Sequence, residues 1–406
     1  MPPMGWLGWD CLGAPGTEAG YLANASILAE RFLPVGYDIA MVGPQWYGVE
    51  ATTSGCRPLA PLELDAHGRP QPSADRFPSA MDGYGFAPLA AQVHRLGLRF
   101  GVHLMRGIPR QAVARALPIA GSRWRCDEVA NLASAGASST DMCSVNPDHP
   151  GAFDWYRAWF AQLAACGVDA VTVDDIASPH GRSGEVGLIR RAIDATGRRI
   201  VLSLSPGPTS LHQGAHLQPR ANERRMGNES PVAWPELRDD IVNLLECEQQ
   251  ARPEAWPAAG VLHVGEVGQG KEDGERGARL TPDEQMLMLT AWTCARRPLL
   301  LAGDLRLMDD RTLRLVTNPE VLALLHAPGR EEWHAAAQGH WFIRSGAYST
   351  WVGWLNTGDE PWSVSLPEWL PDGSRDCWAR ADLPVGARAL TVPAHGARLI
   401  RFGAKA

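Results

Sequence analysis

Two strand-like segments that end in carboxylates are the parts of this chain whose residue types could do chemistry. Residues 4–10 form a stiff apolar run that ends in Asp10, and residues 167–175 form a β-branched run that ends in Asp174 and Asp175. Strands that present polar side chains at their C-terminal ends are typical of the active site of a (β/α)8 barrel. The sequence therefore indicates a site that is assembled from several strand ends.

The adjacent carboxylates Asp174 and Asp175 suggest acid–base or nucleophilic chemistry. Hydrolysis of a glycosidic bond with retention needs two carboxyl groups about 5–5.5 Å apart, one as nucleophile and one as general acid/base. Neighbouring strand residues point to opposite faces, so only one of these two side chains can face the barrel mouth. We expect Asp174 to do so and Asp175 to serve as a loop or cap residue.

Apolar runs of strand length alternate with helical patterns through the first 325 residues, which predicts βα units and a parallel sheet. Eight strands are expected, at residues 4–9, 37–43, 98–105, 168–174, 199–204, 219–226, 259–264 and 298–303. Eight strands that are each followed by a helix predict an α/β fold of the (β/α)8 TIM-barrel type.

Helix signals and long loops support this assignment. Aromatic and apolar residues recur at helical spacing over residues 153–163. Residues 281–284 read Thr-Pro-Asp-Glu, a capping box with proline at the first helical position, so we expect a helix to begin there. Residues 43–80 and 107–150 are long connections after the second and third strands, and loops of this length usually form pocket walls or lids.

The pattern changes after about residue 326. Short β-branched or aromatic runs at residues 341–344, 350–355 and 398–402 are separated by turn residues, which predicts an antiparallel β-sandwich. We therefore expect two domains, a barrel over residues 1–325 and a sandwich over residues 326–406.

Composition excludes several classes of partner. The 406 residues carry a net charge of −7 and are 45% hydrophobic, so neither nucleic acid nor an anionic membrane is expected. The eight cysteines include no C-x-x-C pair, which argues against a metal cluster. No apolar run is long enough to span a bilayer and no signal-peptide pattern precedes the first motif. These features predict a cytoplasmic protein, or a periplasmic or secreted one if a leader was removed.

The motifs resemble glycoside hydrolase family 27, the melibiase or α-galactosidase family. The resemblance covers residues 1–10 and 167–174, and residues 101–110 and 201–209 are similar to a bacterial subgroup. It implies a retaining α-glycoside hydrolase on a TIM barrel, a mechanism that requires no metal or organic cofactor. The family nucleophile is the last Asp of a strand of the form Gly-Val-Asp-x-x-Lys-x-Asp, which falls on Asp174.

The resemblance also implies an acid/base and a set of sugar contacts. The family acid/base is an Asp four residues after an Arg, and here Arg225 places Glu229 at that position. If the loop has a one-residue gap, Asn228 takes the position and no proton donor remains. By position, the residues implied to line the sugar pocket are Trp9, Asp10, Trp46, His103, Arg106, Ser205 and Arg225. Each of these residues also has a purely structural alternative to sugar binding. The aromatic and histidine side chains could pack in the core, and the arginines could form surface ion pairs.

Three departures from the family pattern bear on specificity. Galactose-specific members carry an Asp pair at the end of the second strand, where this chain has Gly43 and Pro44. The Lys two residues before the nucleophile is Thr172, and a carboxylate-bearing family segment reads Trp-Pro-Ala-Ala-Gly at residues 256–260. A site built to bind particular hydroxyls discriminates poorly without those groups. We therefore expect galactose to be a poor substrate and a modified, deoxy or differently configured sugar to be preferred.

Two functions are consistent with these residues. The first is a retaining α-glycoside hydrolase with altered sugar specificity, in which Asp174 forms a glycosyl-enzyme and Glu229 is the acid/base. The second is a degenerate, non-catalytic barrel that binds a carbohydrate, a hypothesis motivated by the lost polar residues. Carboxylates at both catalytic positions favour the enzyme. Both functions predict a small carbohydrate or glycoside as the partner.

Overall fold

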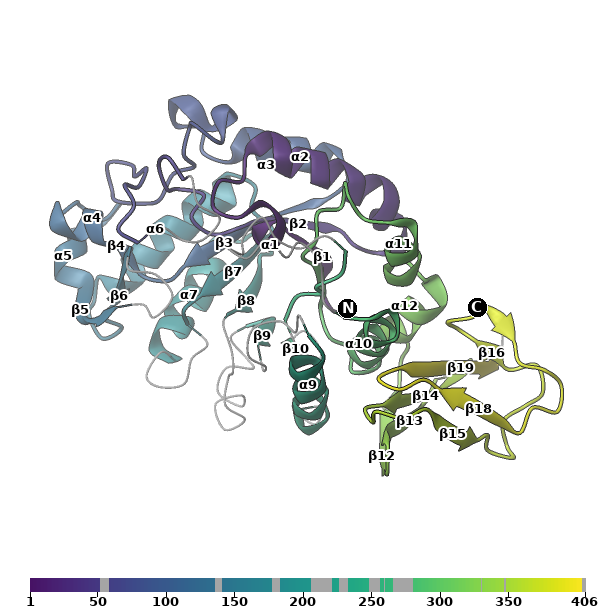
Figure 1. The fold of residues 1–406 in the computed structure, drawn as a ribbon. Helices are drawn as coiled ribbons and strands as arrows, with labels where there is room; N and C mark the ends of the chain where they lie inside the picture. The colour runs from purple at the N-terminus through teal and green to yellow at the C-terminus, as the bar shows by residue number, and fades with distance from the viewer. Residues whose placement is uncertain are drawn as a thin grey trace.

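The computed structural model describes residues 1–51, 58–135, 141–176, 183–205, 221–225, 233–247, 256–258, 260–265, 280–329, 331–346 and 348–403. Within these residues the chain forms a larger part with a parallel sheet and a smaller C-terminal part of antiparallel strands (Figure 1). Helices surround the parallel sheet, and the C-terminal strands lie beside it.

The larger part is organised by eight hydrogen-bonded parallel strands among the described residues. The strands are β1 (Met4–Leu7), β2 (Ile39–Val42), β3 (Arg99–Met105), β7 (Ala170–Asp174), β8 (Val201–Leu204), β9 (Glu223–Arg225), β10 (Trp256–Ala258) and β11 (Leu299–Leu301). They are ordered β10-β9-β8-β7-β3-β2-β1-β11. A parallel bridge from Leu262 to Leu301 joins the segment after β10 to β11, so the sheet curls into a TIM-barrel-like domain.

Alternation along each strand divides the apolar residues between two clusters. In β2, Ala40 and Val42 belong to the large cluster that packs under the helices. Ile39 and Met41 belong to a smaller cluster with Leu7 from the neighbouring strand β1 and Ala170 from β7, which lies beyond β3. Both faces of the strands are therefore buried, as the near-continuous apolar runs in the sequence predict for a parallel sheet.

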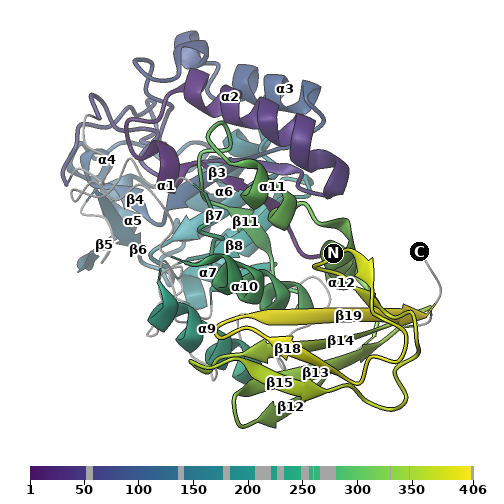
Figure 2. The ribbon, with the colours of Figure 1, turned by 45° about the vertical axis from the view of Figure 1, so that its right-hand side comes forward.

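Helices cover the outside of the parallel sheet (Figures 1 and 2). The longer ones are α2 (Glu18–Ile27), α3 (Ala87–Arg95), α6 (Ala152–Ala165), α7 (Ser183–Ala195), α9 (Trp234–Cys247), α10 (Pro282–Cys294), α11 (Asp310–Val316) and α12 (Pro319–His326). Short turns of helix are α1 (Trp9–Leu12), η1 (Leu28–Phe32), η2 (Leu33–Val35), η3 (Pro78–Gly83), α4 (Arg110–Ala114) and α5 (Cys126–Val129). Among the helices that the structure describes, none is long and apolar enough to cross a membrane.

The capping box predicted at residues 281–284 is present at the start of α10. The Thr281 hydroxyl accepts from the Glu284 amide at 3.3 Å, and the Glu284 carboxylate accepts from the Thr281 amide at 2.6 Å. Two amides that the helix itself cannot satisfy are thereby hydrogen-bonded. Residues 153–163 lie in α6, also as predicted.

Three local predictions were wrong. Trp9 and its neighbours begin the short helix α1, so the first strand ends at Leu7 rather than at residue 9. The connection expected at residues 107–150 contains a small antiparallel sheet, ordered β4 (Ile108–Pro109), β6 (Met142–Val145) and β5 (Ala130–Ala135). The seventh strand was predicted at 259–264, but β10 ends before it, at Ala258, and the described residues 260–264 form only the isolated bridge at Leu262.

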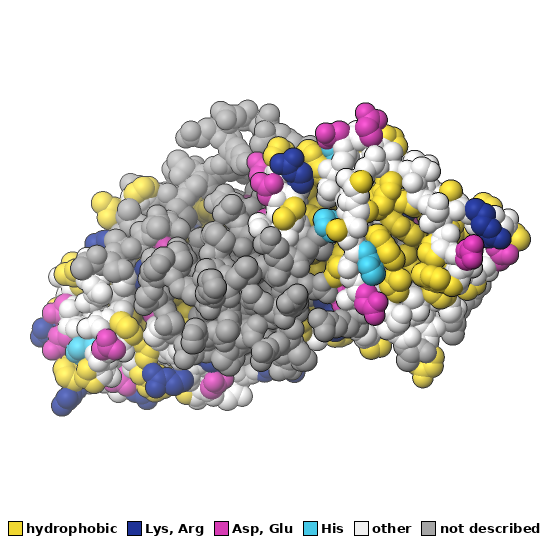
Figure 3. All heavy atoms as spheres, turned by 90° about the horizontal axis from the view of Figure 1, so that it is seen from below, with side chains coloured by type: hydrophobic (Ala, Val, Ile, Leu, Met, Phe, Trp, Pro, Cys, Tyr) yellow, Lys and Arg dark blue, Asp and Glu magenta, His cyan; other side chains and the backbone are white. Residues whose placement is uncertain are grey.

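The C-terminal part consists of two antiparallel sheets. One is ordered β12 (Glu331–Ala336), β13 (Gly339–Ser345), β14 (Ser349–Asn356), β19 (Ala397–Gly403), β16 (Arg375–Asp376) and β17 (Ala381–Asp382), and the other pairs β15 (Trp362–Ser365) with β18 (Ala389–Val392). Val352, Val364 and Val392 belong to a separate apolar cluster shared by the two sheets. Figure 3 shows hydrophobic side chains gathered on one face of this part.

Candidate active site

Asp174 and Asp175 lie at the end of β7, and the strand gives them different environments. Val171 and Val173, both buried, favour the extended backbone that carries the alternation of side chains to this point. The Asp174 side chain keeps 19% of its surface exposed, against 4% for Asp175. The backbone amide of Asp175 donates to Oδ1 of Asp174 at 2.8 Å. Asp174 is therefore the accessible carboxylate of the pair.

His103 on β3 is the nearest basic group described beside Asp174. Its Nε2 atom lies 3.5 Å from Oδ2 of Asp174, and its side chain is 8% exposed. Trp46, in the loop after β2, donates from Nε1 to the carbonyl of His103 at 2.9 Å. The Trp46 ring is only 1% exposed and packs edge-on against Phe86, so the structure places it behind His103 as a support.

Arg106 follows β3, and its guanidinium is surrounded by protein groups with 2% of the side chain exposed. Its Nε donates to the Asp175 carbonyl at 2.5 Å, and its Nη1 donates to Ser144 Oγ at 2.6 Å and to Glu185 Oε2 at 3.2 Å. Its Nη2 lies 3.2 Å from the Asp175 carboxylate. The contacts that the structure describes thus make Arg106 a support for the end of β7, and a contact with sugar stays a prediction.

The short helix α1 brings Trp9 and Asp10 to the end of the sheet. A Cβ atom on Gly43, at the end of β2, would lie 3.0 Å from Trp9 Cα, so the glycine allows the helix to lie directly against the strand end. Oδ2 of Asp10 lies 3.5 Å from Nε2 of His263, which follows the bridge at Leu262. Two histidine–carboxylate pairs therefore stand at strand ends of one parallel sheet.

The remaining candidate residues are only partly described. Ser205 directly follows β8 and is half-buried; its amide donates to the Val173 carbonyl at 2.9 Å, which ties it to β7 beside Asp174. The backbone of Arg225 ends β9, in register with Ala258 of β10. Glu229 and its alternative Asn228 lie outside the described residues, so the acid/base prediction is untouched by the structure.

Two residues of this region were missed by the sequence analysis. His263 lies within the predicted seventh strand, and a histidine in an apolar strand, like His103, was a signal that could have marked it. Glu185 lies in the first turn of α7, where an acidic residue is an ordinary feature. Its contact with Arg106 joins residues 79 positions apart in the chain, and the local sequence pattern does not predict such a contact.

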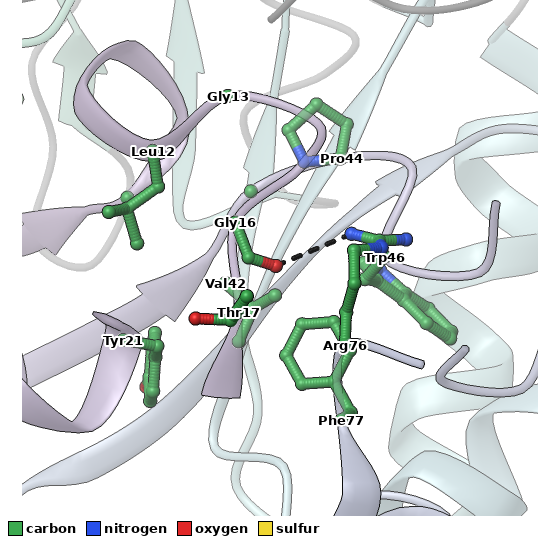
Figure 4. A pocket seen from close by; sticks show the side chains of 12 residues that line it. Leu12, Gly13, Gly16, Thr17, Tyr21, Val42, Pro44, Trp46, Arg76 and Phe77 are labelled. Atoms are coloured by element: carbon green, nitrogen blue, oxygen red, sulfur yellow. Dashed lines mark hydrogen bonds between the residues drawn. The ribbon is translucent and has the colours of Figure 1, made fainter. Parts of the chain in front are cut away.

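A small cavity lies between α1, α2 and the loop after β2 (Figure 4). Its volume of about 20 Å³ suffices for about one water molecule and not for a sugar. Arg76 at its edge donates to the carbonyls of Ala14 and Gly16 from one loop and of Gln45 and Gly48 from the other. This arginine holds together the loops that follow β1 and β2, and the cavity lies at the contact between them.

The position of Thr172 shows what replaces the expected lysine. The Thr172 side chain is buried, and its hydroxyl lies 3.2 Å from the sulfur of Met41 on β2, which is separated from β7 by β3. No cation therefore stands at this position beside Asp174. Among the described residues, no group of three His, Cys, Asp or Glu side chains is arranged to hold a metal ion.

Known structures share this architecture over the whole chain. A glycoside hydrolase family 27 β-L-arabinopyranosidase from Geobacillus stearothermophilus, solved in complex with arabinose, is 36% identical, with a TM-score of 0.94 over 100% of this chain and 97% of that one. The wild-type structure of the same enzyme is 37% identical over 99% of this chain and 96% of that one, also with a TM-score of 0.94.

The chain belongs to glycoside hydrolase family 27.

More distant relatives are also glycoside hydrolases by name. An α-galactosidase from Cyamopsis tetragonoloba is 23% identical over 80% of this chain and 64% of its own length. A Mus musculus α-N-acetylgalactosaminidase is 23% identical over 80% of this chain and 68% of its own length. The chain thus spans about two thirds of these curated relatives. No protein-family model matches the chain.

Proposed function

We propose that this protein is a retaining glycoside hydrolase that cleaves β-L-arabinopyranosides. The supporting observation is the similarity, over essentially the entire chain, to an enzyme named for that activity and crystallised with arabinose. The more general statement, that the protein is a glycoside hydrolase, rests on the same structures and on the α-galactosidase and α-N-acetylgalactosaminidase sequences.

The chemistry of the sugar fits the residues at the end of β2. A β-L-arabinopyranoside has the ring and anomeric configuration of an α-D-galactopyranoside, but it lacks the exocyclic hydroxymethyl group. Where galactose-specific members carry acidic side chains, this chain has Gly43 with Trp9 against it, 3.0 Å from where a Cβ would stand. A wall without carboxylates suits a sugar with one fewer outer hydroxyl.

The proposed mechanism assigns each step to a residue of the chain. The Asp174 carboxylate attacks the anomeric carbon while Glu229 protonates the departing glycosidic oxygen, which forms a glycosyl-enzyme. Glu229 then removes a proton from water, which attacks the same carbon and releases Asp174 and the sugar with retained configuration. His103, 3.5 Å from Asp174, is suited to bind a sugar hydroxyl next to the reacting carbon.

The other proposed roles follow the geometry of the site. We assign sugar contacts to Trp9, Asp10, Ser205 and Arg225, and supporting roles to Trp46 and Arg106. We further propose that the catalytic domain is a closed (β/α)8 barrel over residues 1–325. The antiparallel sheets over residues 326–406 would then form a sandwich domain, which the apolar cluster shared by β14, β15 and β18 supports.

Initial rates on nitrophenyl glycosides test the proposal. We expect kcat/KM for the β-L-arabinopyranoside to exceed that for the α-D-galactopyranoside by at least about tenfold, with the α-N-acetylgalactosaminide slower still. Asp174→Ala, purified in parallel, controls for contaminating glycosidases. Comparable rates on the galactoside would overturn the specificity, and absence of turnover across the panel, with L-arabinose still bound, would favour the non-catalytic barrel.

A further inference from the structure

A buried ionic network lies directly behind the end of β7. Arg106 contacts two carboxylates, Asp175 at 3.2 Å and Glu185 at 3.2 Å, and all three side chains are 4% exposed or less. Nη1 of Arg106 also donates to Ser144 at 2.6 Å. One cation is therefore shared by two carboxylates in an environment from which water is largely excluded.

Glu185 connects this network to the helices outside the sheet. It comes from α7, and it accepts a hydrogen bond from the hydroxyl of Tyr156 on α6. Burial, and then the Glu185 carboxylate beside it, raise the pKa of Tyr156 well above its usual value, so the hydroxyl keeps its proton and acts as donor. Breaking a buried charge pair is strongly destabilising because the remaining charge is left without a partner. The network thus holds Arg106 in one position.

Because Arg106 is held in one position, its contacts with Asp175 restrict the backbone conformation of that residue. Its φ of +59° lies in the left-handed region, which is unfavourable for a non-glycine residue and persists where the surroundings hold it. Arg106 binds both ends of this residue, through Nε to its carbonyl at 2.5 Å and through Nη2 to its carboxylate. In this conformation the Asp175 amide donates to Oδ1 of Asp174 at 2.8 Å.

We propose that Arg106 and Glu185 are positioning residues for the nucleophile, acting through the left-handed backbone of Asp175, whose amide orients and stabilises the Asp174 carboxylate. The inference rests on the proposed function in that it takes Asp174 as the nucleophile. The contribution of Asp175 is made by its backbone, and the carboxylate serves only to anchor it to Arg106.

This arrangement has a consequence for pH dependence. The charged and titratable groups described around Asp174 include His103 on β3, Asp175 beside it, and Arg106 and Glu185 behind it. An amide donor favours the ionised form of a carboxylate, and Arg106 offsets the negative charge of its two partners. Loosening the network therefore makes Asp174 ionise at higher pH, and the acidic limb of the rate profile moves upward.

Two matched substitutions at position 175 separate backbone from side chain. Asparagine tolerates the left-handed conformation, whereas a β-branched residue there is strongly disfavoured. We expect Asp175→Asn to lower kcat/KM less than about tenfold and Asp175→Val to lower it on the order of 100-fold, with KM changed little, because the nucleophile is displaced. Equal losses in both variants would overturn the proposal, because the carboxylate itself would then be what matters.

Arg106→Lys tests whether the two contacts of Arg106 with Asp175 hold the backbone. The control is Arg190→Lys on α7, because Arg190 pairs with Asp194 on the helix surface. We expect Arg106→Lys to move the acidic limb of kcat/KM upward by about 0.5–1 pH unit and Arg190→Lys to leave it in place. Glu185→Gln, which removes the charge and replaces one of the two acceptor oxygens by an amino donor, should fall between them. Circular dichroism and thermal unfolding establish that each variant is folded, and an unshifted limb in a folded Arg106→Lys would refute the role.

A measurement without substrate distinguishes failure of this inference from failure of the proposed function. In protein with [¹³C]aspartate, the Asp174 carboxyl signal is assigned by its loss in Asp174→Asn and is titrated in wild type, Arg106→Lys and Asp175→Val. Higher midpoints in both variants support the positioning role even if no glycoside is cleaved. Unchanged midpoints refute it even if the enzyme is active on arabinopyranosides.

Discussion

Nε2 of His103 lies 3.5 Å from Oδ2 of Asp174, and the two residues come from the neighbouring strands β3 and β7. The separation is too long for a good hydrogen bond. Neither ring nitrogen of His103 has a hydrogen-bond partner among the described residues, although the side chain is buried. A buried polar group without a partner costs about 1–3 kcal/mol. A sugar hydroxyl placed between His103 and Asp174 would recover that energy on binding.

His103→Gln should therefore weaken substrate binding and catalysis together. We expect kcat/KM to fall by about 10- to 100-fold, because the amide cannot place its polar atoms where both ring nitrogens of the imidazole lie. The control is His94→Gln. His94 bonds Asp169 at 2.8 Å, and Asp169 precedes β7 at the opposite end of the sheet from Asp174. An equal loss in both variants would mean that the effect is on folding.

Asp174→Ala should abolish turnover of glycosides while the protein stays folded, since the proposed nucleophile is removed from a partly exposed position. Added azide should restore part of the rate and yield a glycosyl azide of inverted configuration, because the small anion attacks from the vacated side. The product is identified by NMR. Rescue that yields only the retained configuration would contradict the assignment of Asp174.

Introducing an acidic residue at Gly43 should not create a galactosidase. The Cβ of Gly43→Asp would approach Cα of Trp9 at 3.0 Å and its Cβ at 3.2 Å, so α1 must shift. Overpacking of this kind costs about 1–3 kcal/mol. Urea unfolding and rates on nitrophenyl α-galactoside measure both effects. Gly20→Ala in α2, whose new Cβ would meet neighbours only at 3.4 Å or more, is the control and should be neutral or stabilising.

Local sequence pattern was sufficient for much of the fold. Val171 and Val173 set the extended backbone of β7 that ends at Asp174, and that preference depends only on neighbouring residues. The capping box at Thr281 is equally local, and the helix begins there. Features of this kind are encoded within a few residues, which is why the sequence predicted them.

The parts that sequence did not predict depend on contacts between distant segments. Glu185 meets Arg106 only because α7 packs behind the end of β3, and His263 meets Asp10 only because the sheet curls. The two residues of β4 are too few to show a strand pattern, and their pairing with β6 stabilises them. Trp9 belongs to a helix because Gly43 leaves room for one turn there.

Arg344 should be the most sensitive single position for the attachment of the C-terminal sheets. Its side chain is fully buried on β13; it donates to the carbonyl of Leu324 on α12 at 2.8 Å and also bonds the Cys294 carbonyl of α10 and Glu331. Figure 2 shows α10 and α12 beside these sheets. Arg344→Met should lower the free energy of unfolding by about 3–5 kcal/mol, because Glu331 loses its buried partner.

Guanidinium denaturation of Arg344→Met measures this loss. The matched control is Arg157→Met, which removes an exposed pair with Asp154 on α6 and should change stability little. If Arg344→Met behaved like the control, the C-terminal sheets would not depend on this residue for their attachment.

Stability should also fall as the pH drops below about 6.5, in part through His340 on β13. Burial lowers the pKa of His340 below its ordinary value, so near pH 6 the unfolded chain binds more protons at this residue than the folded one does. Stability that is present above the unfolded pKa is then lost as the pH falls through the folded pKa. Calorimetric Tm values between pH 8 and pH 5 should therefore decline less steeply in His340→Gln than in the wild type.

At pH 8 the imidazole is neutral in both states, so any Tm difference there reports packing alone. Parallel curves over the whole range would show that His340 does not contribute to the acid sensitivity.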